Sequence, residues 1–374
     1  MAGIYIHIPF CKKACTYCDF HFTTSFKYVD EMVEAICREI VLKKHRISSP
    51  VQSIYFGGGT PSVVPLKGLQ RIFDTLVSNF DIRPDAEITL EANPDDLDQQ
   101  QLNALRTLPI NRFSIGIQSF FAEDLLWMNR AHTASEAESC IKRSQDAGFE
   151  NLSIDLIYGY PILTDEKWLT NIHKAIAFGT PHISSYSLTV EPRTALAHAI
   201  SSGKQPVPSD EQSARQFQLL TENLINAGFE HYEISNYSLP GKYALHNTNY
   251  WRGVPYLGIG PAAHGFDGQH RYINIANNAK YLGALGENKL AETIEELSLK
   301  DRYNEYIMTS LRTMWGTDLK RVRNEFGADY LQQLHKESLS FVKNGQLILA
   351  NDTFYLSAEG KLFADGIAAN LFAD

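Results

Sequence analysis

Cysteine is scarce in this sequence, and long apolar segments are missing. The 374 residues include five cysteines, an odd number that is too small for the disulfide framework of a secreted protein. No segment reaches the ~18 consecutive apolar residues of a membrane-spanning helix. The start, MAGIYIHIPF, lacks the basic and apolar regions of a signal peptide. The sequence therefore predicts a cytoplasmic protein without a transmembrane segment.

An excess of basic charge is missing as well. The chain has 43 acidic against 34 basic residues, a net charge of −9, and no basic run. Because broad affinity for nucleic acid depends on neutralising phosphates with Lys and Arg, we expect no nucleic-acid partner. Hydrophobic residues at 44% and charged residues at 21% are typical of globular proteins, which excludes a largely disordered chain.

Short apolar runs alternate with helical patterns in the first half of the chain. The runs are GIYIHIP from Gly3, SIYFGG from Ser53, EITLEA from Glu87, RFSIGIQ from Arg112, NLSIDLIYG from Asn151 and HISSYSLTV from His182. Each is typical of a buried strand, and the stretches between them have the periodicity of amphipathic helices. This alternation predicts an α/β fold, a partial (β/α)6 barrel over residues 1–200.

The pattern changes in the rest of the chain. Residues 201–290 contain one amphipathic helix and a region rich in Tyr, Asn and Gly, and we interpret them as an extension of the barrel. Residues 291–374 contain helices around 303–314 and 330–343, a β-hairpin at Asn351-Asp352 and a closing helix from 358. They predict a small, winged-helix-like α+β domain at the C-terminus.

Three of the five cysteines form a C-x3-C-x2-C cluster directly after the first predicted strand. They are Cys11, Cys15 and Cys18. Zinc sites usually have four nitrogen or sulfur ligands, and an iron–sulfur cluster held only by protein needs a fourth thiolate. Position 20, where a fourth cysteine could follow, is Phe20. A site with three thiolates leaves one metal position open to another ligand.

Other interpretations of the cysteines remain. His7 and His21 are near enough in sequence to complete a zinc site, and the three thiols could also be ordinary cysteines. Cys37 and Cys140 fall on the apolar faces of predicted helices, where cysteine acts as a small hydrophobic residue, so we expect both in the core.

The string YIHIPFCKKACTYCDF, with FGGGTP further along, resembles the radical S-adenosylmethionine (SAM) superfamily over essentially the whole chain. The branch it resembles contains the oxygen-independent coproporphyrinogen III oxidases (HemN type) and the haem chaperones (HemW type). The resemblance implies a [4Fe–4S] cluster on Cys11, Cys15 and Cys18, with SAM on the fourth iron. The cluster's electron then cleaves SAM to a 5′-deoxyadenosyl radical, so the difficult chemistry belongs to the cofactors.

Residues at the ends of the predicted strands are candidates for the SAM site. Glycines such as Gly58 and Gly59, before Thr60, allow the backbone to approach a ligand, although most such turns are only tight turns. Glu91, Gln118 and Asp155 end later strands, where barrel sites are built, and helix caps or buried hydrogen bonds are the alternatives. The resemblance assigns further roles: Glu91 at the methionyl or ribose end, Gln118, Arg130 and Asp155 on the adenosine side, and Tyr5 and Tyr17 beside the cofactor.

The string HNTNYW, from His246 to Trp251, matches a motif of the HemW type. An imidazole suits haem iron, and Tyr250 and Trp251 supply flat apolar surfaces for a porphyrin. Without the resemblance, a hydrogen-bonded loop is the simpler interpretation. The sequence does not decide whether the axial ligand is His246 or one of the nearby histidines, His231, His264 and His270. His264 could instead border the cofactor pocket.

Two features separate the chain from the oxidases. Phe20 replaces their fourth cysteine, and only ten residues precede Cys11, where the oxidases carry a longer covering segment. We therefore expect a haem chaperone that passes haem to an acceptor haem protein, for example a respiratory one, and that lacks coproporphyrinogen III oxidase activity. The alternatives are that oxidase reaction and another radical reaction such as methyl transfer. The sequence leaves open whether the chain forms a homodimer.

Overall fold

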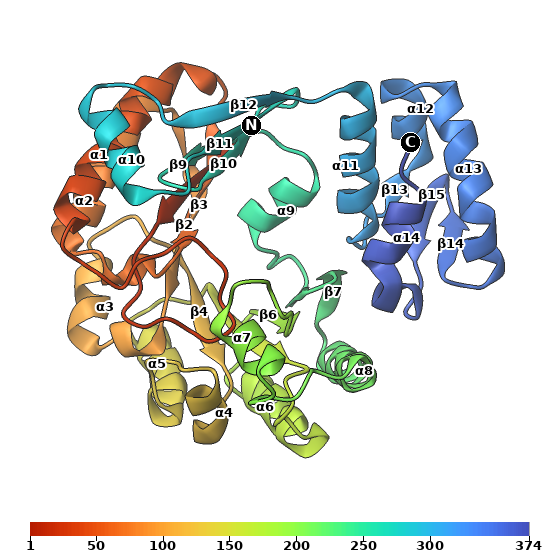
Figure 1. Cartoon of the computed structure of the whole chain (residues 1–374), viewed down its shortest axis with the longest axis horizontal. Helices are drawn as coiled ribbons and strands as arrows, with labels where there is room; N and C mark the ends of the chain where they lie inside the picture. The colour runs from red at the N-terminus through yellow and green to blue at the C-terminus, as the bar shows by residue number, and fades with distance from the viewer. Residues whose placement is uncertain (374) are drawn as a thin grey trace.

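Six parallel strands form the centre of the structure, a computed structural model that describes residues 1–373 (Figure 1). They are β1 (Ala2–Ile8), β2 (Val51–Gly58), β3 (Ile82–Ala92), β4 (Arg112–Gln118), β5 (Leu152–Tyr158) and β6 (His182–Ser187). Each predicted apolar run forms one of these strands, and neighbours pair in parallel in sequence order. The runs are apolar because parallel strands covered on both faces bury most of their side chains.

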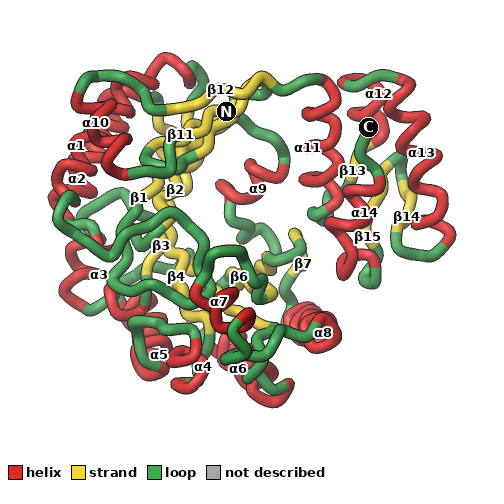
Figure 2. Tube along the Cα trace, viewed as in Figure 1, coloured by secondary structure: helices red, strands yellow, loops and turns green. Residues whose placement is uncertain are grey.

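Helices follow the strands and cover the outer face of the sheet (Figures 1 and 2). They are α1 (Val29–Lys43), α2 (Leu66–Asn79), α3 (Gln99–Leu105), α4 (Ala122–Trp127), α5 (Ala134–Asp146) and α6 (Asp165–Ala177). Helix α1 shows why, because Met32, Ile36 and Ile40 recur on one face and are all buried. Cys37 and Cys140 are buried in the same core, as expected. No helix in the described part of the chain is both long enough and apolar enough to cross a membrane.

Shorter strands extend the sheet at both ends. Strands β7 (Glu230–Glu233) and β8 (Asn236–Ser238) follow α7 (Ala195–Ser201) and α8 (Asp210–Asn226), and β8 pairs antiparallel with β6. After α9 (Leu245–Trp251), β9 (Tyr256–Ile259) pairs with β1. Beyond it lie β10 (His264–Phe266), β11 (His270–Asn274) and, after α10 (Asn278–Gly286), β12 (Glu292–Glu296). The order is β12-β11-β10-β9-β1-β2-β3-β4-β5-β6-β8-β7, so the sheet is an open, partial barrel.

The last part of the chain has its own hydrophobic core. It contains α11 (Leu299–Leu311), β13 (Thr317–Asp318), α12 (Leu319–Glu325), α13 (Ala328–Lys343), β14 (Leu347–Ala350), β15 (Thr353–Leu356) and α14 (Ala364–Asn370). The predicted hairpin is present. Asn351 and Asp352 both have positive φ angles, of 51° and 57°, as a two-residue type I′ turn requires. Buried residues such as Tyr303 and Phe354 belong to this second core.

Ion pairs connect the C-terminal unit to the large sheet. Arg312, at the end of α11, pairs with the buried Glu233 of β7, and Glu233 also forms a backbone bridge with Thr313. Arg271 of β11 pairs with Glu305 of α11. Helix α11 therefore faces the sheet (Figure 1).

Candidate functional site

The three cysteines of the motif lie in the loop that connects β1 to α1. The Cys11 amide donates to the Thr23 carbonyl at 3.0 Å, and the Thr16 amide donates to the Met128 carbonyl at 3.1 Å, so the loop is held against the barrel. Burial raises the pKa of Cys18 to about 12 and also raises that of Cys11, and charges on the other thiols of the motif add to both effects. Both shifts disfavour the thiolate forms of Cys11 and Cys18, and a bound cation would counteract this effect.

No single-ion metal site is found at the motif, since within residues 1–373 no three His, Cys, Asp or Glu side chains are arranged to hold one metal ion. His7 does not complete a zinc site, because its two ring nitrogens contact the Tyr5 hydroxyl and the His21 carbonyl.

A glycine turn lies against the start of the cysteine loop. The Gly59 amide donates to the Ile8 carbonyl at 2.8 Å, and the Thr60 amide donates to the Phe10 carbonyl at 2.7 Å. A β-carbon at Gly59 would approach the Phe10 carbonyl oxygen to 2.6 Å, so only glycine fits there. Gly58 has a φ angle of 101°, which also favours glycine. The Thr60 hydroxyl is 3.5 Å from the Cys11 sulfur, which joins the turn to the motif.

Two partly buried carboxylates lie on β3 and β5: Glu91 is near the carboxyl end of β3, whereas Asp155 is in the middle of β5 and not at its end, as the sequence had suggested. Burial raises the pKa of Glu91 to about 7 and that of Asp155 to about 6. Tyr55 donates to Glu91 at 2.7 Å, and Ser114 donates to Asp155 at 3.2 Å. In residues 1–373 neither carboxylate forms an ion pair, so a ligand with a positive charge or hydroxyl groups would stabilise both in ionised form.

Arg130 connects these strand ends to the cysteine loop. Its guanidinium donates to the Asn93 side chain at 2.6 Å, to the Gly116 carbonyl at 2.8 Å and to the Cys15 sulfur at 3.3 Å. The Tyr17 hydroxyl lies 3.5 Å away from it. Gln118, at the end of β4, is buried and has a φ angle of 64°, a left-handed backbone that is uncommon for this residue type.

The HNTNYW segment forms the short helix α9, whose first turn is held by Glu87. The amides of Leu245 and His246 each donate to this carboxylate at 2.9 Å. The His246 Nδ1 atom contacts the Ser53 hydroxyl at 3.0 Å, and its ring stacks on Tyr55 with a centroid distance of 5.2 Å. Burial lowers the pKa of His246 to about 4, so the imidazole is neutral at pH 7.

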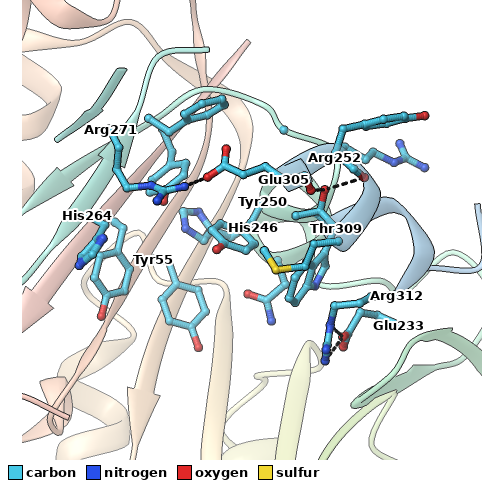
Figure 3. A pocket seen from close by; sticks show the side chains of 18 of the residues that line it. Tyr55, Glu233, His246, Tyr250, Arg252, His264, Arg271, Glu305, Thr309 and Arg312 are labelled. Carbon is cyan, nitrogen blue, oxygen red and sulfur yellow. Dashed lines mark hydrogen bonds and ion pairs between the residues drawn. The ribbon is translucent and has the colours of Figure 1, made fainter. Parts of the chain in front are cut away.

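A large cavity lies between the sheet and the C-terminal unit. Its volume is about 1140 Å³, and its walls include Tyr5, Glu91, His246, Tyr250 and Trp251. Figure 3 shows His246, Tyr55 and His264 on one side and Glu305, Thr309 and Arg312 of the C-terminal unit on the other. The Tyr250 side chain is 44% exposed, and the Trp251 ring lies nearly perpendicular to it at 5.0 Å. Such a volume exceeds that of most small-molecule pockets.

Comparisons with known proteins agree with this architecture. The radical SAM superfamily matches residues 5–175, and the HemN C-terminal domain matches residues 297–363. The chain is 30% identical to the heme chaperone HemW of Bacillus subtilis over 373 residues, 98% of each protein. The chain belongs to the HemW family. A 42% identical match to HemW of Synechocystis covers 69% of this chain and 64% of that protein.

A solved structure also resembles the whole chain. It is coproporphyrinogen III oxidase (HemN) from Escherichia coli, with a TM-score of 0.87 and 23% identity over 100% of this chain and 90% of that one. At this identity the likeness shows the fold alone. Membership of the radical SAM superfamily implies a [4Fe–4S] cluster and SAM as cofactors, and the three thiols and the partly buried carboxylates described above fit these two groups.

The cavity of this HemW-family chain brings together only part of the predicted site. Tyr5, Gly58, Glu91, His246, Tyr250 and Trp251 line it. The cavity is not lined by the three motif cysteines or by Tyr17, Gly59, Thr60, Gln118, Arg130 and Asp155. Of the other candidate histidines, His264 lines the cavity. His231 stacks on Tyr237 and its Nδ1 contacts Lys361, whereas His270 contacts Asp267, and neither lines the cavity.

The sequence analysis missed residues on both sides of the HemW-family site. Tyr55, which contacts Glu91 and stacks on His246, lies two residues before Gly57 in a strand that was recognised. The alternation of side chains along that strand could have found it. Arg271 and Arg302 line the cavity from β11 and α11, and no local pattern marks them, because only the packing of the C-terminal unit brings them there.

Proposed function

We propose that this chain is a haem chaperone, which binds haem in the cavity between the sheet and the C-terminal unit and passes it to an acceptor haem protein. The name of its HemW relatives points to haem as the cargo. The observation that carries the proposal is the environment of His246. This imidazole is neutral, it is held by Ser53 through Nδ1, and it lines a cavity with exposed aromatic rings.

His246 is the axial ligand in this proposal. A haem ligand must be unprotonated at the coordinating nitrogen, and a hydrogen bond at the other nitrogen fixes the orientation of the ring. Contact of Nδ1 with Ser53 leaves Nε2 for iron. Tyr250 and Trp251 pack against the porphyrin in this arrangement, which supplies affinity by burying apolar surface. His264 is the alternative ligand because it lines the same cavity.

The cofactors occupy the other side of the site in our proposal. Cys11, Cys15 and Cys18 hold the [4Fe–4S] cluster, which supplies one-electron chemistry when bound. Gly58, Gly59 and Thr60 hold the methionyl end of SAM. Tyr5, Tyr17, Glu91, Gln118, Arg130 and Asp155 make the remaining contacts. Glu91 and Asp155 accept hydrogen bonds in their ionised form, and Arg130 keeps the cysteine loop in register with the strand ends.

The chain's own architecture supports a division of labour. We propose that residues 1–200 hold the cofactors, that residues 201–290 carry the haem motif, and that residues 291–374 close the cavity without supplying cluster ligands. A cytoplasmic location and the existence of an acceptor haem protein remain predictions. Phe20, which replaces a cysteine of the oxidases, is 67% exposed and lines the cavity, and it favours haem carriage over oxidation of coproporphyrinogen III.

A haem titration tests the proposal. Anaerobically reconstituted protein is titrated with haem, and the absorption spectrum is compared among wild type, His246→Ala and His270→Ala. We expect about one haem per chain in wild type and in the His270→Ala control, whose histidine is outside the cavity, and a lost axial-ligand spectrum in His246→Ala. Absence of haem binding in wild type contradicts the proposal. Robust conversion of coproporphyrinogen III in a parallel assay would instead identify an oxidase.

A further inference from the structure

Five arginines line the cavity, and two of them have no carboxylate partner. The paired ones are Arg271 with Glu305, Arg312 with Glu233, and Arg321 with Glu325. Within the described residues, Arg252 and Arg302 form no ion pair with a carboxylate, and the Nε atom of Arg302 is buried without a hydrogen-bond partner. Burying an N–H group without an acceptor costs free energy. A ligand that brings acceptor oxygens into the cavity would remove this cost.

Arg252 lies beside an aromatic ring, and Arg302 lines the same cavity from the C-terminal unit. Arg252 directly follows Trp251 at the end of α9, and its guanidinium carbon is 4.1 Å from the centroid of the Trp315 ring. Stacking on a ring holds the guanidinium plane in place and leaves its N–H groups at the edge free to donate. Arg302 comes from α11, the helix that also supplies Glu305 and Thr309 to the wall (Figure 3).

We propose that Arg252 and Arg302 bind the two propionate carboxylates of haem while His246 binds its iron. This inference rests on the proposed function. Haem is a flat apolar ring with two negative groups on one edge, and the cavity offers aromatic rings, one neutral imidazole and two guanidinium groups without partners. Guanidinium groups match carboxylates particularly well, because two parallel N–H groups can donate to the two oxygens.

The first test changes the ligand and leaves the protein as it is. Haem dimethyl ester keeps the iron and the ring but has lost both negative charges. Because each charge-assisted hydrogen bond contributes roughly a factor of 10 or more in affinity, we expect wild-type protein to bind the ester at least ~10-fold more weakly than haem. Equal affinities would overturn the inference and leave haem carriage intact. Failure to bind either compound would instead refute the proposed function.

The second test assigns the effect to the two side chains. Arg302→Gln and Arg252→Gln should each weaken haem binding ~10-fold and leave binding of the ester unchanged, so that the two affinities converge in the double variant. Arg83→Gln is the matched control, since Arg83 is exposed, pairs with Asp85 and lies outside the cavity. Thermal unfolding and iron content show whether each variant is folded. Equal weakening of haem and ester would indicate loss of packing and contradict the inference, and if a variant misfolds, the wild-type comparison still decides.

Discussion

The two sides of the site differ in how their polar groups are satisfied. The cofactor side consists of Cys11, Cys15, Cys18, Thr60, Glu91 and Arg130. There, the two terminal nitrogens of Arg130 donate to four acceptors within the protein, although its Nε atom is buried without a partner, and Glu91 accepts from Tyr55. The cargo side consists of His246, Tyr250, Trp251, Arg252 and Arg302. There, Tyr250 is 44% exposed and the Arg302 side chain makes no hydrogen bond among the described residues.

This difference indicates how one fold can hold a permanently bound cofactor and also bind a cargo molecule that it later releases. Side chains that already contact one another are preorganised, so a resident cofactor meets them in place. Exposed rings and unpaired cations gain partners only when cargo enters, and they lose them when it leaves. The affinity for cargo therefore depends on few groups, and a carrier can release what it binds.

The largest expected effect separates the two sides completely. Replacing Cys11, Cys15 or Cys18 by Ala should abolish the cluster, because in the proposed site each of these thiolates holds one iron. Haem binding should persist, since none of the three lines the cavity. Cys37→Ala, in the core of α1, is the control and should keep about four irons and four sulfides per chain, as the cluster type requires. Iron and sulfide analysis together with a haem titration checks this. If a cysteine variant loses both the cluster and haem binding, the two sides of the site are not independent.

A smaller effect is expected from the core of the C-terminal unit. Phe354 is 1% exposed, and Phe354→Ala should lower the free energy of unfolding by about 3–5 kcal/mol. Haem affinity should fall as this wall of the cavity loosens, whereas the iron content should stay unchanged. Ile348→Ala on the same hairpin is the control, because Ile348 is 50% exposed and should cost less than about 0.5 kcal/mol. Urea unfolding gives both values, and loss of iron in Phe354→Ala would contradict the proposed division of labour.

The smallest effect concerns the response of the cofactor side to pH. Burial raises the pKa of Glu91 from 4.5 to about 7, so between these values the folded state keeps a proton that the unfolded state releases. The free energy of unfolding must therefore fall as the pH rises through this range, by on the order of 1–3 kcal/mol. Glu91→Gln should remove this part of the pH dependence, and the exposed Glu287→Gln should keep it. Urea unfolding of apoprotein from pH 5 to 8 measures the slopes, and parallel slopes for Glu91→Gln and wild type would refute the assignment.

The central sheet could be predicted from the sequence because its strands are buried on both faces. Runs such as IYIHI and SIDLI need no partner to be recognised, since burial alone makes them apolar. Strands β7 to β12 were not predicted. They are three to five residues long, and β12 (ETIEE) is largely exposed at the edge of the sheet, so neither length nor alternation distinguishes them from loops.

The candidate site could be proposed from the sequence where its residues follow one another in the chain. The cysteine motif, the glycine turn and HNTNYW are local strings, and each was found. The contacts that join them are not local: Ser53 and His246 are 193 residues apart, and Arg271 meets Glu305 only because the C-terminal unit packs on β11. The periodicity of a single sequence does not indicate which distant residues contact each other.

The open sheet affects how easily the proposed cargo can enter and leave the cavity. A closed barrel would have to break backbone hydrogen bonds between strands before a rigid disc could pass through its wall. Here β7 and β12 end the sheet without pairing with each other, and the C-terminal unit is joined to the sheet by ion pairs such as Arg271–Glu305, in which both side chains are partly exposed. A partly exposed pair of this kind is weak and screened by salt, whereas the pair of Arg312 with the buried Glu233 is harder to break, so the unit separates more easily from β11 than from β7. In the proposed carrier, a small displacement of the C-terminal unit at β11 would open the cavity without unfolding the part that contains the three cysteines.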